Sequence, residues 1–148
     1  MNGTSHVRDR RGQFERDYDG TSSTLRDARK DVVGWLLDSG FDGDLQDRAA
    51  LVVSELATNA LQASPGSAYG VKLRRAGDRS AILAVTSHTD FKRPPPREHW
   101  GPASTCAARG RGLMIVEAVA DGVEVDLPGQ DTVVVTATFR SVSPLRAV

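Results

Sequence analysis

Two long stretches in the first half of the chain carry apolar residues at steps of three and four positions, the spacing typical of amphipathic helices. The first helix is expected to begin at a capping hydroxyl, Thr21, Ser22 or Ser23, and to run to about Ser39. Gly40 follows it as a stop signal. The apolar stripe of this helix comprises Leu25, Ala28, Val32, Trp35 and Leu36.

The second helix is predicted over residues 44–64 and carries the most regular pattern in the chain. Asp44 is its expected N-cap, and the pair Pro65-Gly66 ends it. One broad apolar stripe runs along it and comprises Leu45, Ala49, Val52, Val53, Leu56 and Ala60. A stripe of this width predicts a helix that packs its whole length against a core.

The remaining apolar segments are short β-rich runs, which predicts strands. A weakly marked strand is expected at residues 13–19. Two stronger runs within residues 69–87 are joined by a hairpin signal at residues 76–78. A loop from about His88 to Ala108 follows and is longer than usual connections. After it, the pattern predicts a helix, a strand, a turn at Gly129 and a last strand that ends at Phe139.

The order of elements is therefore β-α-α-β-β-loop-α-β-β, with few helices and strands that mostly connect by hairpins. It favours an α/β (α+β) fold, a two-layer sandwich whose mixed, mainly antiparallel sheet is covered by about three helices, rather than a doubly wound parallel sheet. The length of 148 residues suits one domain. We expect a flexible arm at residues 1–12, the domain at residues 13–140 and a loose tail at residues 141–148.

Composition narrows the classes of function. Lysine plus arginine and aspartate plus glutamate number 19 each, so charge gives no general attraction to nucleic acid or to an anionic membrane. Cys106 is the only cysteine, which excludes a disulfide framework and a cysteine-based metal site. The sequence has no apolar run of the roughly 18 residues that span a membrane, and no signal-type apolar core. We expect a cytoplasmic protein with no direct nucleic acid or membrane partner.

Glu55 and Asn59 lie four residues apart on the second predicted helix and therefore share a face, at the polar margin of the apolar stripe. A carboxylate at such a margin can take a proton from a nucleophile. A carboxamide oxygen beside it can bind Mg²⁺, which prefers oxygen ligands. The alternative is a solvated Glu and Asn at the edge of an amphipathic helix, and the pattern alone favours it.

A second candidate site lies in the segment ARGRGLMIVEAVA, residues 108–120. Gly110 and Gly112 would let the backbone approach an anion, and a helix start offers free amides. Arg109 and Arg111 add charge that suits phosphate. The alternative is a flexible helix entrance with arginines that face solvent. The spacing fits neither a Walker loop nor a Rossmann fingerprint.

Together, the segments SELATNALQAS and GRGLMIVEAVAD resemble the first motif and the glycine motif of the Bergerat-fold ATPases, the GHKL superfamily that includes gyrase and the histidine kinases. Size and layout are most similar to its stand-alone branch, bacterial anti-sigma factors that are also serine kinases. The resemblance covers roughly residues 13–139. It implies the Bergerat fold, with ATP and Mg²⁺ as cofactors, and a sigma factor and an antagonist protein as partners.

The resemblance also implies roles for individual residues. Glu55 matches the general base that activates the attacking hydroxyl, and Asn59 matches the Mg²⁺ ligand. Thr132 matches a polar residue on the late strand that helps to hold the adenine. The lid hinge and the helix start that hold the nucleotide phosphates match Arg109, Gly110, Arg111, Gly112 and Leu113.

Ser87 is the main departure from this family. It stands where the middle motif has an Asp, followed by glycines, whose carboxylate accepts a hydrogen bond from the adenine amino group. Asp90 comes three residues later and the glycines are missing. Strand alternation still puts Ser87 on one face with Leu83 and Val85, so its hydroxyl can point into the pocket and accept a bond.

Two functions follow from these residues. The first is an ATP- and Mg²⁺-dependent serine/threonine kinase that sequesters a sigma factor and phosphorylates an antagonist protein, which Glu55, Asn59 and the glycine motif favour. The second is a binding module of the same fold with weak or no nucleotide turnover, which Ser87 favours. A homodimer is compatible with both.

Overall fold

The computed structural model describes residues 12–88, 107–129 and 131–141, and for residues 107–111 it describes the helix backbone. The elements follow the predicted order, a strand, two helices, two strands, a helix and two strands. Their bounds are β1 Gln13–Gly20, α1 Thr24–Asp38, α2 Gly43–Ala63, β2 Gly66–Ala76, β3 Ser80–His88, α3 Ala107–Val119, β4 Gly122–Asp126 and β5 Thr132–Arg140.

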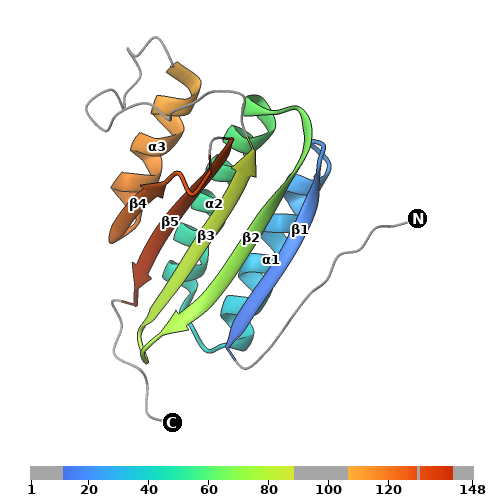
Figure 1. Cartoon of the computed structure of the whole chain (residues 1–148). Helices are drawn as coiled ribbons and strands as arrows, with labels where there is room; N and C mark the ends of the chain where they lie inside the picture. The colour runs from blue at the N-terminus through green and yellow to red at the C-terminus, as the bar shows by residue number, and fades with distance from the viewer. Residues whose placement is uncertain (1–11, 89–106, 130, 142–148) are drawn as a thin grey trace.

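The strands form one five-stranded sheet in the order β1-β2-β3-β5-β4. All three helices lie on one face of this sheet, as Figure 1 shows, which confirms the predicted two-layer sandwich. The sheet was expected to be mixed, but each of the four pairings within the described residues is antiparallel. The reason is that β3 and β5, although separated by α3 and β4 in the chain, run in opposite directions.

The core lies between the helices and the sheet. Every apolar residue predicted for the stripe of α2 is buried, together with Ala57 and Ala63, so this helix is buried along one side. On the strands, buried and partly exposed residues alternate, most regularly along β3 and β5. The largest fully buried side chains from the strands are Tyr69, Phe139, Leu73 and Leu83.

The connection between α1 and α2 shows how local sequence sets helix ends. Gly40 adopts a φ of 85°, and the amides of Gly40 and Phe41 donate to the carbonyls of Leu37 and Leu36, which closes α1 with a Schellman motif. The predicted N-cap of α2, Asp44, is wrong. Asp42 is the cap, because its carboxylate accepts from the amide of Leu45 at 2.8 Å and its backbone is extended.

Other predictions fall on residues that the structure does not describe. The arm at residues 1–12 and the tail at residues 141–148 lie outside the described residues, except for their innermost positions. The same holds for most of the predicted loop, including Asp90 and Cys106. Within the described ranges, no helix is both long and apolar enough to cross a bilayer.

A half-buried polar cluster fixes α1 against β1. The phenol of Tyr18 donates to a carboxylate oxygen of Asp31 at 2.7 Å, and Arg16 pairs with the same oxygen while its guanidinium lies over the Tyr18 ring. The ring of Tyr18 also stacks on Tyr69, with centroids 5.4 Å apart. Burial, followed by the bond to Asp31, raises the pKa of Tyr18 well above its usual range.

We expect Tyr18→Phe to lower the free energy of unfolding at neutral pH by about 2 kcal/mol, since it removes a hydrogen bond to a charged acceptor. The raised pKa means that the folded state keeps the phenol proton that the unfolded chain loses near pH 10. This part of the stability is present below that pH and is lost above it. Urea unfolding should therefore show that the free energy of unfolding falls less between neutral and alkaline pH in Tyr18→Phe than in the wild type. Equal losses in both proteins would contradict the assignment.

Candidate functional site

Glu55 and Asn59 lie on the margin of α2 that faces the beginning of α3. Both side chains are half-buried, whereas Val52 and Leu56, on the adjoining stripe, are buried in the core. The four-residue spacing puts them one turn apart on the same side of the helix. Within the described residues, Glu55 forms no ion pair, so its carboxylate is not neutralised by a described cation.

Gly112 brings α3 directly onto these two side chains. A Cβ atom at Gly112 would lie 3.0 Å from both the amide nitrogen and the amide oxygen of Asn59, and 3.3 Å from Oε2 of Glu55. Gly112 is buried and its φ is not positive, so the glycine is needed for close approach and not for a left-handed backbone. The structure thus places three of the predicted site residues in one cluster.

A small cavity adjoins this cluster between the helices and the sheet. Its volume is about 20 Å³, which is room for about one water molecule. Three residues predicted from the sequence line it, Asn59 from α2, Ser87 from β3 and Leu113 from α3. The other lining residues are apolar and come from α2, β3 and β5: Leu56, Val85, Val133 and Val135.

Ser87 lies where strand alternation predicts. It is half-buried on the face of β3 that also carries Leu83 and Val85, and it pairs with Val133 on β5. None of the lining residues is charged, so the cavity offers the hydroxyl of Ser87 and the amide of Asn59 as its side-chain hydrogen-bonding groups. Both groups can donate and accept hydrogen bonds, so neither restricts a ligand to the role of donor or of acceptor.

The glycine motif lies inside α3 and not before it. The helix begins at Ala107, five residues ahead of Gly112, because alanine and arginine favour helix and extend it past the glycines. The free backbone amides at the helix start therefore belong to residues 107–110, which include Arg109 and Gly110. The side chains of Arg109 and Arg111 lie outside the described atoms, and their predicted contact with phosphate stays a prediction.

Thr132 is not brought into the cavity. It pairs with His88 where β3 ends and β5 begins, and alternation along β5 directs it to the face opposite Val133 and Val135. Its predicted role beside the adenine stays a prediction. The apolar lining of the cavity was not predicted as part of the site; in the structure, the alternation along β5 buries Val133 and Val135 on the side of the helices.

Arg48 lies two turns before Glu55 on the same margin of α2 and plays a structural role. Its guanidinium donates to the carbonyls of Val119 and Arg140 and pairs with Asp121 at 3.3 Å. It therefore ties the end of α3 and the end of β5 to α2. Because the end of α3 is held in this way, the position of its beginning against Glu55 is constrained as well.

Solved structures confirm the fold. One is the structure of the RsbU and RsbW domains of Rv1364c from Mycobacterium tuberculosis, with a TM-score of 0.65, 21% identity and 90% of this chain covered. This chain covers 34% of that chain. Another is the SiaB-SiaC complex from Pseudomonas aeruginosa, with a TM-score of 0.61, 13% identity, and coverage of 83% of this chain and 88% of that chain.

No curated protein matches this chain. A family model does match, over residues 20–139, and its description is histidine kinase-like ATPase domain. The matched residues run from the end of β1 to the end of β5 and include Glu55, Asn59, Ser87 and Gly112. The family resemblance predicted from the sequence is therefore confirmed, and this chain belongs to the histidine kinase-like ATPase domain family.

Proposed function

We propose that this protein binds ATP with Mg²⁺ at the cluster formed by α2, α3, the end of β3 and the beginning of β5. The observation that carries the proposal is the contact of Gly112 with both Asn59 and Glu55, beside a cavity that Ser87 and Leu113 line. A carboxylate, a carboxamide and a glycine-rich helix start are the groups that phosphoryl transfer needs for proton removal, metal binding and phosphate approach.

The residues present fit a magnesium ion that is bound largely by the nucleotide. The described residues contain no group of three or more histidine, cysteine, aspartate or glutamate side chains that would hold a metal by themselves. Mg²⁺ commonly takes only one or two protein ligands and completes its shell with phosphate oxygens and water. The amide oxygen of Asn59 would be such a ligand, and bound Mg²⁺ would neutralise charge on the phosphates.

The proposed reaction is phosphorylation of a serine or threonine hydroxyl on a protein. Glu55 would accept the hydroxyl proton as the oxygen attacks the γ-phosphorus and the bond to the β-phosphate oxygen breaks. The half-buried position of Glu55 suits this role, since the carboxylate is held by α2 yet stays reachable from solvent. The backbone of α3 would position the phosphates.

The proposed biological role is that of an anti-sigma factor whose kinase activity acts on an antagonist protein. The support is the sequence resemblance to the stand-alone branch of the family, together with likeness in fold to a structure that contains an RsbW domain.

A second candidate is a binding module that regulates a partner without nucleotide turnover. The observation that favours this second function is the uncharged lining of the cavity, with Ser87 in place of a carboxylate.

We expect wild-type protein to bind Mg-ATP weakly in calorimetry, and Ser87→Asp to tighten binding about tenfold, because a charged acceptor replaces a neutral one. GTP is the control ligand. A carboxylate only accepts hydrogen bonds, and guanine presents a carbonyl oxygen where adenine presents an amino group. Ser87→Asp should therefore leave GTP binding unchanged or weaken it. If ATP and GTP respond alike, or if the wild type binds no Mg-ATP at millimolar concentration, the proposed site is wrong.

A further inference from the structure

The end of α3 that lies away from Gly112 is bound by a side chain of α2. Arg48 donates from Nη1 to the carbonyl of Val119 at 3.2 Å, and from Nη2 to the carbonyl of Arg140 at 2.8 Å. Val119 is the last residue of α3, where helix carbonyls have no partner within the helix and where the helix dipole favours a cation. Arg48 therefore caps α3 from a neighbouring helix.

Asp121 completes this arrangement, and we call Arg48 and Asp121 together the clamp. One carboxylate oxygen of Asp121 accepts from Nη1 of Arg48 at 3.3 Å and from the amide of Arg140 at 2.6 Å. Both backbone polar groups of Arg140, the last residue of β5, are thus bound by the clamp. The side chain of Arg48 is only 19% exposed, and its guanidinium also lies over the ring of Phe139. The clamp therefore joins α2, α3 and β5 at one point.

The middle of α3 is held by contacts that have no preferred direction. Leu113 and Val116 are buried against the core, and the burial of apolar surface is non-directional. Gly112 faces Asn59 at close range but has no side chain that could interlock with it. A small tilt of α3 about its two buried residues would change the distance between Gly112 and Asn59, and the hydrogen bonds of the clamp oppose such a tilt.

The clamp and the site lie on the same side of α3. Gly112 and Val119 are seven positions apart, which is about two turns and about 10 Å along the helix axis. Both positions meet α2, Gly112 through Asn59 and Glu55, and Val119 through Arg48. Because α3 contacts α2 at both places, fixing the contact at Val119 restricts the contact at Gly112.

We propose that Arg48 is a positioning residue of the nucleotide site. By holding the end of α3, it keeps Gly112 against Asn59 and Glu55, the proposed magnesium ligand and the proposed base. This role rests on the proposed function, since it takes Mg-ATP as the ligand of the site. Lysine would keep the charge of Arg48 but not this role, because a single ammonium group lacks the fixed fork of donors that a guanidinium presents.

A double-mutant cycle in urea unfolding tests the clamp without any ligand. Gly112→Ala would put a methyl group 3.0 Å from the terminal atoms of Asn59, and a clamped α3 cannot move away. In Arg48→Lys the helix can tilt, so the unfavourable effect of the methyl group on the unfolding equilibrium constant should shrink by more than about twofold. Separate sites normally combine independently to within about twofold. The helix propensity that alanine adds is the same in both backgrounds and cancels.

Calorimetry then measures Mg-ATP binding at a temperature at which every variant is folded. Arg48→Lys should weaken Mg-ATP binding about tenfold. The reason is that a misplacement of roughly 1 Å can cost about 10²-fold in the function of a positioned group, and a tilted helix moves Gly112 by less. A merely structural role would lower the resistance to urea and leave the affinity of the folded protein unchanged.

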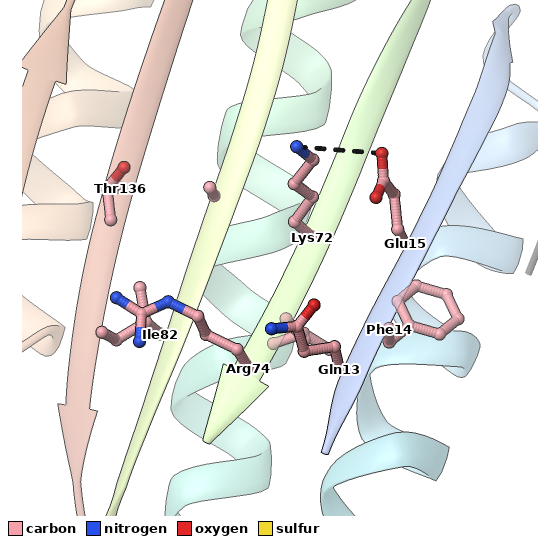
Figure 2. A pocket seen from close by; sticks show the side chains of 9 residues that line it. Gln13, Phe14, Glu15, Lys72, Arg74, Ile82 and Thr136 are labelled. Carbon is pink, nitrogen blue, oxygen red and sulfur yellow. Dashed lines mark ion pairs between the residues drawn. The ribbon is translucent and has the colours of Figure 1, made fainter. Parts of the chain in front are cut away.

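Two control variants remove contacts of a similar kind that do not reach α3. Ser141→Ala loses the hydrogen bond to Asp42, the N-cap of α2, just beyond the end of β5. Lys72→Gln loses the ion pair with Glu15 on the sheet face that no helix covers, beside a hollow of about 370 Å³ (Figures 1 and 2; Figure 2 shows the pair). Both should combine independently with Gly112→Ala and leave Mg-ATP binding unchanged.

Three outcomes would overturn the proposal. They are independent effects of Arg48→Lys and Gly112→Ala in the unfolding cycle, control variants that behave like Arg48→Lys, and unchanged Mg-ATP binding in Arg48→Lys despite a coupling in the cycle. A wild type that binds no Mg-ATP contradicts the proposed function instead. In that case the unfolding cycle, which needs no ligand, still decides whether Arg48 positions Gly112 against Asn59.

Discussion

Glu55→Gln should abolish phosphoryl transfer while leaving the fold and the nucleotide affinity in place. The amide has nearly the same shape as the carboxylate, and glutamine and glutamate have similar helix propensities, so α2 should form normally. No ion pair with a described residue is lost. An amide cannot take the proton of the attacking hydroxyl, and positioned proton transfer typically contributes about 10²–10⁴-fold in rate. The assay follows label from radioactive ATP into candidate antagonist proteins.

Asp47→Asn is the matched control for this loss of charge. Asp47 is an exposed carboxylate on the same helix and lies outside the cluster at Gly112, so its removal should change neither the rate nor the nucleotide affinity. A Glu55→Gln variant as active as the wild type would show that Glu55 is not the base. A wild type that transfers no phosphate, yet still binds its protein partner, would favour the binding module over the kinase.

Most of the fold could be predicted from the sequence because its signals are local. The stripe of α2 needs only the helical period, and all of its predicted members are buried. The hairpin between β2 and β3 follows from a short turn, and Gly77 there has a φ of 76°. The direction of β3 relative to β5 has no such local signal, since it depends on how the crossover through α3 and β4 packs.

The helix ends show the limit of local signals. Asp42 and Asp44 are both good capping residues two positions apart, and sequence does not reveal which one has the extended backbone that a cap requires. At α3, the glycines suggested a later start, but the alanines and the arginine before them continue the helix. Competition between neighbouring residues decided both boundaries.

The candidate site was predicted as a set of residues, and the structure adds how some of them meet. Sequence spacing relates Glu55 to Asn59 because both lie on one helix. Nothing in the spacing shows that Gly112 packs onto both of them, because that contact joins residues more than fifty positions apart.

Asn59→Ala should reduce Mg-dependent ATP binding at least about tenfold, within the range seen when support for a bound metal is removed. The variant lacks the proposed oxygen ligand and also one of the two polar side chains that line the cavity. The fold should tolerate the change, because alanine is the strongest helix former and the atoms that face Asn59 across the helix contact belong to a glycine. Calorimetry with ATP, with and without Mg²⁺, measures the effect.

Two further variants separate the loss of a metal ligand from a change in the packing between α2 and α3. Asn59→Asp keeps an oxygen ligand and should retain Mg-dependent binding. Gly112→Ala keeps Asn59 but puts a methyl group where the amide stands, 3.0 Å from both of its terminal atoms, so the amide must turn and binding should fall less than in Asn59→Ala. If Asn59→Ala loses ATP equally with and without Mg²⁺, then Asn59 contacts the nucleotide and not the metal. If it binds Mg-ATP as the wild type does, the contact between α2 and α3 positions the helices and holds no ligand.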